Sequence, residues 1–149
     1  QKHVIPRKVV ERFGEDLTGK TFAIWGLAFK PDTDDMRQAA AITIINELTK
    51  RGAKVKAYDP KAEKEAKVCY LKDNKNVEYC DSKYTVLVDA DAMILVTEWK
   101  EFRQPDFIEI KKRLKNPVIF DGRNQFDAHS LSDKGFEYYQ IGVSSKLNK

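Results

Sequence analysis

Residues 21–27 read TFAIWGL, an almost continuous apolar run in a chain of 149 residues. Runs of this kind are typical of strands that are buried on both faces of a parallel sheet. Residues 91–97, DAMILVT, have the same character and predict a second buried strand. Shorter strands are predicted at residues 54–59, 77–79, 118–121 and 136–141.

Helical patterns separate these strands. In residues 38–51 apolar side chains recur at the spacing of one helix face, and Gly52 supplies a C-terminal stop. Further helices are predicted at residues 62–68, 82–90, 105–114 and 128–133. Strands that alternate with helices predict an α/β fold: a Rossmann-like, doubly wound, mainly parallel sheet with helices on both faces.

The chain divides into one main domain and two short flanking pieces. Residues 1–17 predict a helical tail and linker with too little apolar surface to stand alone, and we expect the helix to continue a segment upstream. Residues 18–143 are expected to form the domain. Residues 144–149 are expected to be a disordered tail.

Composition excludes several classes of protein. The 27 basic and 23 acidic residues are interspersed and leave a net charge of only +4, which argues against a disordered polyelectrolyte and a dedicated nucleic-acid surface. No apolar run approaches the roughly 20 residues that span a bilayer, and no signal-peptide pattern opens the sequence. We therefore expect a cytoplasmic domain without membrane or nucleic-acid partners.

Cysteine and histidine are too sparse to indicate a metal site or a nucleophilic centre. Cys69 and Cys80 form no Cys-x-x-Cys pair, and His3 and His129 lie far apart. No catalytic residue is predicted from these side chains.

Ligands of open α/β sheets bind beyond the carboxyl ends of the strands, and residues 26–37, GLAFKPDTDDMR, follow the first strand. This segment is neither Gly-x-Gly-x-x-Gly nor a P-loop, so a standard dinucleotide cradle is disfavoured. Phe29 could pack on a base or sugar, and Lys30 and Arg37 could pair with phosphates. The alternative is purely structural: Asp34 and Asp35 would satisfy backbone amides and hold Arg37 in a salt bridge.

Three other strand ends carry weaker signals. Asp59 could accept hydrogen bonds from a ribose, although without a Gly-rich fingerprint we favour a cap or turn. Trp99 could cover the sheet edge as readily as touch a ligand. After residues 118–121, Gly122 allows a sharp turn that would place Arg123 at the ligand rim. Lys30 and Arg123 are then expected in neighbouring loops that flank one crevice.

Four of these segments together resemble a known family: residues 26–37, Ala-Tyr-Asp-Pro at 57–60, Thr-Glu-Trp at 97–99 and Phe-Asp-Gly-Arg-Asn at 120–124. The chain resembles the C-terminal UDP-binding domain of the UDP-glucose 6-dehydrogenases, within the UDP-glucose/GDP-mannose dehydrogenase family. The resemblance extends over about residues 1–142. One departure is Gln-Ala-Ala at 38–40, where the family often has an acidic residue and a proline.

The resemblance implies an enzyme that oxidises UDP-glucose to UDP-glucuronate with two NAD+ and a covalent intermediate on a cysteine. In the family, the NAD-binding domain and the central helical domain with that cysteine precede this region. Neither Cys69 nor Cys80 matches the nucleophile motif, so the isolated chain is expected to be inactive. Residues 1–13 resemble the end of the central helix that mediates family dimers, and a homodimer is expected for the full-length enzyme.

The resemblance also implies roles for individual residues. Phe29 and Lys30 match positions that contact the UDP-sugar, and Arg123 matches an arginine that reaches the nucleotide. Arg37 matches an arginine that approaches the cofactor NAD across the cleft. The expected substrate is UDP-glucose, and the expected pathway leads to glucuronate-containing polysaccharide. The alternatives are the same domain of a UDP-N-acetylmannosamine or GDP-mannose dehydrogenase, or a free-standing nucleotide-binding module.

Overall fold

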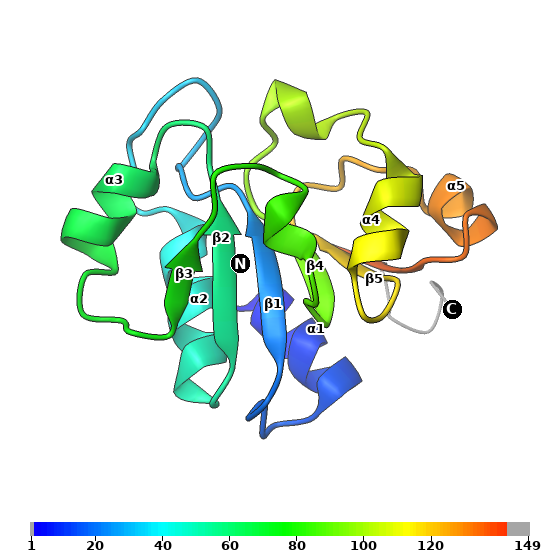
Figure 1. Ribbon diagram of the computed structural model, residues 1–149, viewed down its shortest axis with the longest axis horizontal. Helices are drawn as coiled ribbons and strands as arrows, with labels where there is room; N and C mark the ends of the chain where they lie inside the picture. Colours follow the sequence, from blue (N-terminus) through cyan, green and yellow to red (C-terminus); the bar gives the residue numbers. More distant parts are fainter. Residues whose placement is uncertain (1, 143–149) are drawn as a thin grey trace.

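A six-stranded, entirely parallel sheet forms the centre of the computed structural model, which describes residues 2–142 (Figure 1). Its strand order is β3-β2-β1-β4-β5-β6: successive strands are added outward from β1 to β3, and β4 then pairs on the other side of β1. This switch in the order of the strands confirms the doubly wound fold. The strands are β1 (Thr21–Trp25), β2 (Lys54–Tyr58), β3 (Val77–Tyr79), β4 (Ala92–Leu95), β5 (Val118–Asp121) and β6 (Glu137–Gln140). The tail expected at residues 144–149 lies outside the described residues.

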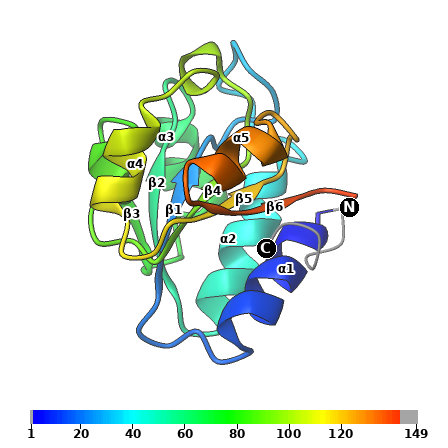
Figure 2. The same cartoon turned by 90° about the vertical axis from the view of Figure 1, so that its right-hand side faces the viewer.

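Helices cover both faces of the sheet. The helices α1 and α2 pack on one face, and α4 lies on the opposite face (Figure 2). The helices are α1 (Val4–Phe13), α2 (Ala40–Lys50), α3 (Glu63–Glu65), α4 (Phe107–Arg113) and α5 (Ala128–Asp133). A π turn (Ala66–Tyr70) extends α3, and single 3-10 turns are formed by Thr85–Leu87 and Lys100–Phe102.

Two predicted helices differ from the structure. The helix expected at residues 82–90 is only the 3-10 turn Thr85–Leu87, because Val88 is extended and Asp89 has a left-handed φ of 61°. The helix α4 begins later than expected, after Asp106, whose carboxylate accepts hydrogen bonds from the backbone N–H groups of Ile108 and Glu109. Pro105 therefore precedes the helix rather than occupying its first turn.

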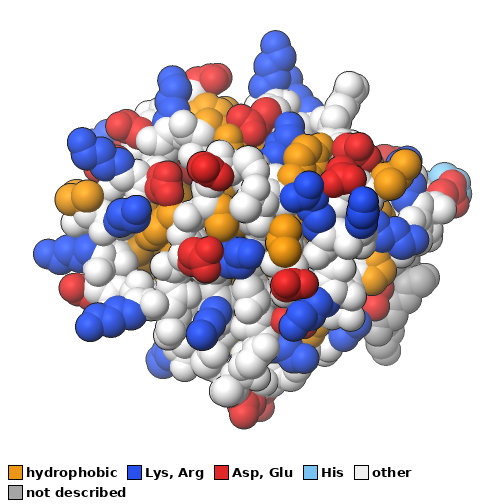
Figure 3. Space-filling model, viewed as in Figure 1, with side chains coloured by type: hydrophobic (Ala, Val, Ile, Leu, Met, Phe, Trp, Pro, Cys, Tyr) orange, Lys and Arg blue, Asp and Glu red, His pale blue; other side chains and the backbone are white. Residues whose placement is uncertain are grey.

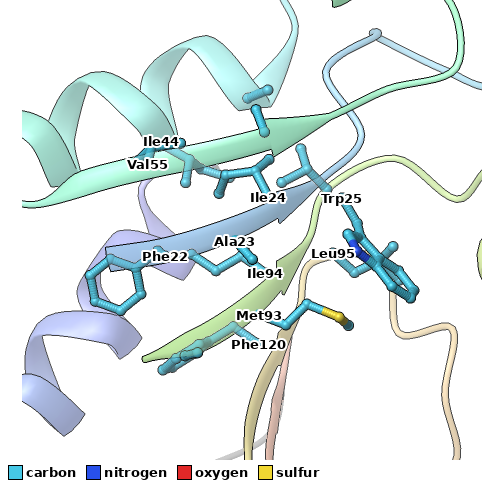
Figure 4. Close-up of a cluster of buried hydrophobic side chains, with 14 of the residues drawn as sticks. Phe22, Ala23, Ile24, Trp25, Ile44, Val55, Met93, Ile94, Leu95 and Phe120 are labelled. Atoms are coloured by element: carbon cyan, nitrogen blue, oxygen red, sulfur yellow. The ribbon is translucent and has the colours of Figure 1, made fainter. Parts of the chain in front are cut away.

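The core is built around β1, where Phe22, Ala23, Ile24 and Trp25 are all fully buried (Figure 4). This burial on both faces explains why the strand has no polar alternation. Burying a large apolar side chain contributes roughly 1.5–3 kcal/mol, so the central strands supply much of the hydrophobic stabilisation.

The N-terminal helix α1 packs on the main domain. Ile5 and Val9 are buried, and the Phe13 ring meets the Phe22 ring edge to face at 5.4 Å between centroids. An ion pair of 2.7 Å joins Arg12 Nε to Glu137 Oε2 on β6. The apolar side of this helix is therefore covered by the sheet and by α2.

The loops that follow β1 and β4 lie together at one end of the molecule, at the top of Figure 1, and the α1–β1 connection lies at the other. On the face shown in Figure 3, basic and acidic side chains alternate without a large patch of either sign. In the described part of the chain, no helix is both long enough and apolar enough to cross a bilayer.

Candidate functional site

The loop after β1 starts in close contact with the end of β4. Gly26 has a φ of +101°, and a Cβ at this position would lie 2.4 Å from the Thr97 Cβ. The Thr97 hydroxyl also donates a hydrogen bond of 2.7 Å to the Ala28 carbonyl. Only glycine fits both the backbone angle and this approach, so the β1 and β4 ends are joined at the point where the strand order reverses.

The same loop then exposes two of the expected ligand residues. The Phe29 N–H donates to the Asp35 carbonyl at 2.7 Å, and the buried Met36 anchors the returning chain. The Phe29 side chain is left 54% exposed, and Lys30 is exposed beside it. A large aromatic ring in solvent next to a cation suits contact with a base or sugar.

Arg37 forms the salt bridge that the structural alternative predicted, with Asp35 as its partner. Arg37 Nη2 lies 2.8 Å from Asp35 Oδ2, and Arg37 Nε lies 3.1 Å from Asp35 Oδ1. Hydrogen bonds from the Arg37 side chain and backbone lower the pKa of Asp35 to about 2. The Arg37 side chain remains 80% exposed, so the pair fixes its direction and leaves the guanidinium accessible.

Asp59, after β2, has a structural role that its sequence position left open. Its Oδ2 accepts hydrogen bonds from Leu27 N at 2.7 Å, Ala28 N at 3.0 Å and Trp99 Nε1 at 3.0 Å. Its Oδ1 accepts from Lys61 N at 2.8 Å and Ala62 N at 2.7 Å. The carboxylate is 4% exposed and ties the ends of β1, β2 and β4 together.

The residues at the ends of β1 and β2 do not form a binding site for NAD of the dinucleotide-fold type. Dinucleotide folds hold the pyrophosphate on a Gly-rich turn at the helix after β1, and the ribose on an acid after β2. Here the cap of that helix is the buried Ala39, with no glycine turn before it. The acid after β2 is Asp59, which already accepts five hydrogen bonds. The ends of β1 and β2 therefore lack both parts of a dinucleotide cradle.

A second buried carboxylate, Asp121, shapes the loop after β5. It is fully buried and accepts hydrogen bonds from the backbone N–H groups of Arg123, Gln125 and Phe126. It also accepts one of 2.6 Å from the Tyr138 hydroxyl, and burial together with this bond raises the pKa of Tyr138. The loop is thereby held against β6.

Gly122 and Asn124 each suit their position in this loop for a different structural reason. Gly122 N donates to the Leu95 carbonyl at 2.8 Å, and a Cβ on Gly122 would lie 2.9 Å from that oxygen. Gly122 is therefore required by this close approach. Asn124 adopts a left-handed φ of 52° and exchanges two hydrogen bonds with the Ile141 backbone.

Arg123 lies between these two residues with its side chain half exposed. Its Nη2 and Nε lie 2.8 and 3.1 Å from Glu98 Oε2. Glu98 was not among the predicted site residues. The only available signal was its place in Thr-Glu-Trp, directly after a buried strand.

The Thr97-Glu98-Trp99 segment connects the other three motifs. Thr97 contacts the loop after β1, Glu98 pairs with Arg123, and Trp99 donates to Asp59. This arrangement corrects the expectation that Lys30 and Arg123 lie in neighbouring loops. Because β4 lies between β1 and β5, the two cations are separated by the residues that follow β4.

Other chemical groups near this edge contribute less. An open hollow of about 470 Å³ is lined by Asp32, Thr33, Asp34 and Lys61, and its carboxylates disfavour a diphosphate. Cys69 is exposed, while burial raises the pKa of Cys80 and disfavours its thiolate. Among residues 2–142, no three His, Cys, Asp or Glu side chains gather as a metal site would require.

Comparison with known proteins gives a consistent match. Residues 23–128 match the model of the UDP-glucose/GDP-mannose dehydrogenase family, UDP binding domain. A UDP-glucose 6-dehydrogenase of Pseudomonas aeruginosa is 39% identical over 149 residues, covering 95% of this chain and 32% of the relative. The chain thus spans about a third of that relative's length.

Two solved structures share the fold. A UDP-glucose dehydrogenase from Pyrobaculum islandicum superposes with a TM-score of 0.76 and 25% identity, over 96% of this chain and 30% of that one. An NDP-N-acetyl-D-galactosaminuronic acid dehydrogenase from Methanosarcina mazei Go1 gives a TM-score of 0.77 and 27% identity, over 99% of this chain and 30% of that one.

Proposed function

Because this chain belongs to the UDP-glucose/GDP-mannose dehydrogenase family and corresponds to its UDP-binding domain, we propose that it binds UDP-glucose for a longer, NAD-dependent UDP-glucose 6-dehydrogenase. The observation that carries the proposal is the position of Arg123. Its loop is tied down by the buried Asp121, and its guanidinium emerges half exposed at the carboxyl edge of the sheet. A fixed, accessible guanidinium suits a phosphate.

The proposed ligand contacts lie on both sides of the residues after β4. Arg123 binds the nucleotide from the β5 side, and Lys30 neutralises phosphate charge from the β1 side. The exposed Phe29 ring packs on the base or the sugar. Ligand sites of open α/β sheets occur at this switch point, which supports the assignment.

NAD is assigned to the remainder of the longer protein, together with the nucleophilic cysteine. Arg37 is proposed to approach the cofactor from this domain, because the Asp35 pair directs its guanidinium outward without covering it. The 149-residue chain alone should therefore reduce no NAD+ when it is given UDP-glucose. The homodimer of the longer enzyme remains a prediction from the resemblance, and the cytoplasmic location remains a prediction from the composition and apolar patterning of the sequence.

Calorimetry of the chain with UDP, UDP-glucose, GDP and NAD+ tests the assignment. UDP and UDP-glucose should bind, GDP should bind more weakly, and NAD+ should not bind. Arg123→Ala should weaken UDP-glucose binding by about 1.5–3 kcal/mol, or roughly tenfold or more, because a charge-assisted contact is lost. Arg123→Lys should also weaken it, because lysine lacks the planar fork.

A matched control is Arg113→Ala, which removes another partly exposed arginine that is paired with a glutamate. It should leave UDP-glucose affinity unchanged. Equal affinities for wild-type protein and Arg123→Ala would remove Arg123 from the site. NAD+ binding by the chain itself would contradict the assignment of the cofactor to the rest of the protein.

A second candidate substrate is an N-acetylated UDP-sugar, because the similar Methanosarcina mazei structure is named for an N-acetylated sugar. Both candidates share the UDP portion, so Arg123→Ala should affect them equally. Competition of UDP-glucose and UDP-N-acetylmannosamine against one bound UDP probe separates them. Tighter binding of the N-acetylated sugar would favour the second candidate.

A further inference from the structure

We infer that Glu98 is a positioning residue for Arg123: it holds one edge of the guanidinium and leaves the other edge free for a nucleotide phosphate. This inference rests on the proposed function, since it concerns how Arg123 is presented to that ligand. It assigns to the middle residue of Thr97-Glu98-Trp99 a role distinct from those of its two neighbours.

The hydrogen-bond geometry leaves a bidentate edge open. A guanidinium carries five N–H donors in a planar fork. Glu98 Oε2 takes one donor from Arg123 Nε at 3.1 Å and one from Nη2 at 2.8 Å. The second Nη2 donor and both Nη1 donors are not used by this pair. A phosphate can therefore bind the terminal edge in the paired, two-bond manner while Glu98 stays in place.

Glu98 is itself held from both sides along the chain. Thr97 is 1% exposed and bonded to the Ala28 carbonyl, and Trp99 is 6% exposed and bonded to Asp59. The Glu98 backbone thus lies between two buried, hydrogen-bonded neighbours. Its side chain therefore extends from a fixed backbone position, which suits a group that orients another side chain.

Holding Arg123 in advance should favour binding more than folding. A long arginine side chain loses rotamer freedom when it is immobilised on a ligand, and an existing pair removes part of that loss. A half-exposed ion pair contributes little to stability, so loss of Glu98 should leave the melting temperature nearly unchanged. Repulsion between the carboxylate and a diphosphate acts in the opposite direction. If repulsion dominated, loss of Glu98 would tighten nucleotide binding.

Calorimetric titration of the chain with UDP shows whether loss of Glu98 weakens or tightens binding. Glu98→Ala should weaken binding roughly three- to tenfold, because Arg123 becomes free to rotate. Glu98→Gln retains an acceptor oxygen and should recover most of the affinity. Glu98→Ala added to Arg123→Ala should cause no further loss, because the two residues act as one unit.

The matched control is Glu109→Ala, which breaks the Arg113–Glu109 pair at 2.9 Å, with the same 32% exposure of the glutamate side chain. It should not change UDP affinity. If Arg123→Ala weakens UDP binding but Glu98→Ala does not change or tightens it, the positioning inference is wrong and the proposed function stands. If Arg123→Ala has no effect, the proposed binding site fails, and the role of Glu98 fails with it.

Discussion

Replacing Asp59 with asparagine separates a structural carboxylate from one that binds a ribose. The substitution conserves shape but turns one acceptor oxygen into an NH2 donor. In the more favourable amide orientation, the remaining oxygen keeps the three bonds from Leu27, Ala28 and Trp99. The N–H groups of Lys61 and Ala62 then face a donor and lose their partner.

The magnitude follows from these bonds. Losing two hydrogen bonds to a buried carboxylate amounts to about 1.5–3 kcal/mol each, and the other three bonds lose their charge assistance. Relaxation of the loop recovers part of this, so we expect a loss of about 3–5 kcal/mol. That is a large share of the roughly 5–15 kcal/mol by which a domain is stable. For a domain of this size it lowers the melting temperature by roughly 6–20 °C.

Thermal and urea unfolding of wild-type protein, Asp59→Asn and the control Asp34→Asn measure the effect. Asp34 is an exposed carboxylate on the adjoining loop, so its substitution should shift the melting temperature by no more than about 2 °C. An Asp59→Asn protein that melts like the wild type would refute the structural assignment. If that protein had also lost nucleotide affinity, Asp59 would instead be a ligand residue.

Three further predictions concern the same edge of the sheet. Tyr138→Phe removes the 2.6 Å bond to buried Asp121 and should lower the free energy of unfolding by about 1–3 kcal/mol; an unchanged urea midpoint would contradict this. The Asp35 carboxylate, with its pKa lowered to about 2, should stay ionised at pH values where a free aspartate is protonated, and its contribution to stability should be lost as the pH falls toward 2. Carboxyl-carbon NMR titration checks this midpoint, which Arg37→Ala should raise only part of the way toward that of a free aspartate, because the backbone N–H of residue 37 still donates to the carboxylate. In a full-length enzyme, Arg37→Ala should raise the NAD+ requirement more than the UDP-glucose requirement; a lower melting temperature with unchanged cofactor kinetics would favour a structural role.

Much of the fold could be predicted because its signals are local. The apolar run at residues 21–27 and the helical spacing in residues 38–51 each report burial along one segment. The prediction of a helix at residues 82–90 was wrong because the extended backbone of Val88 ends the turn and Asp89 then adopts a left-handed conformation. Helical periodicity does not report such backbone angles.

The candidate site could be predicted only in part, because its contacts join residues that are far apart in the chain. The sequence placed Arg123 at a strand end, but whether it is solvated or held depends on Glu98, which is 25 residues away along the chain. The two meet because β4 and β5 pair in the sheet. By its sequence position alone, Asp59 could likewise be a cap or a ribose ligand. The hydrogen bonds from Leu27, Ala28 and Trp99 commit it to a structural role.

By itself, the sequence determined the α/β class, the buried strands and the four motifs, because hydrophobic periodicity and turn chemistry act between neighbours in the chain. The tertiary structure decided the strand order and therefore which motifs touch. Hydrogen bonds at the sheet edge join residues that are 25 to 69 positions apart, and burial then commits Asp59 and Asp121 to the fold while Arg123 stays exposed. A carboxylate in water can serve a ligand, whereas one enclosed by backbone amides has no acceptor capacity left to offer.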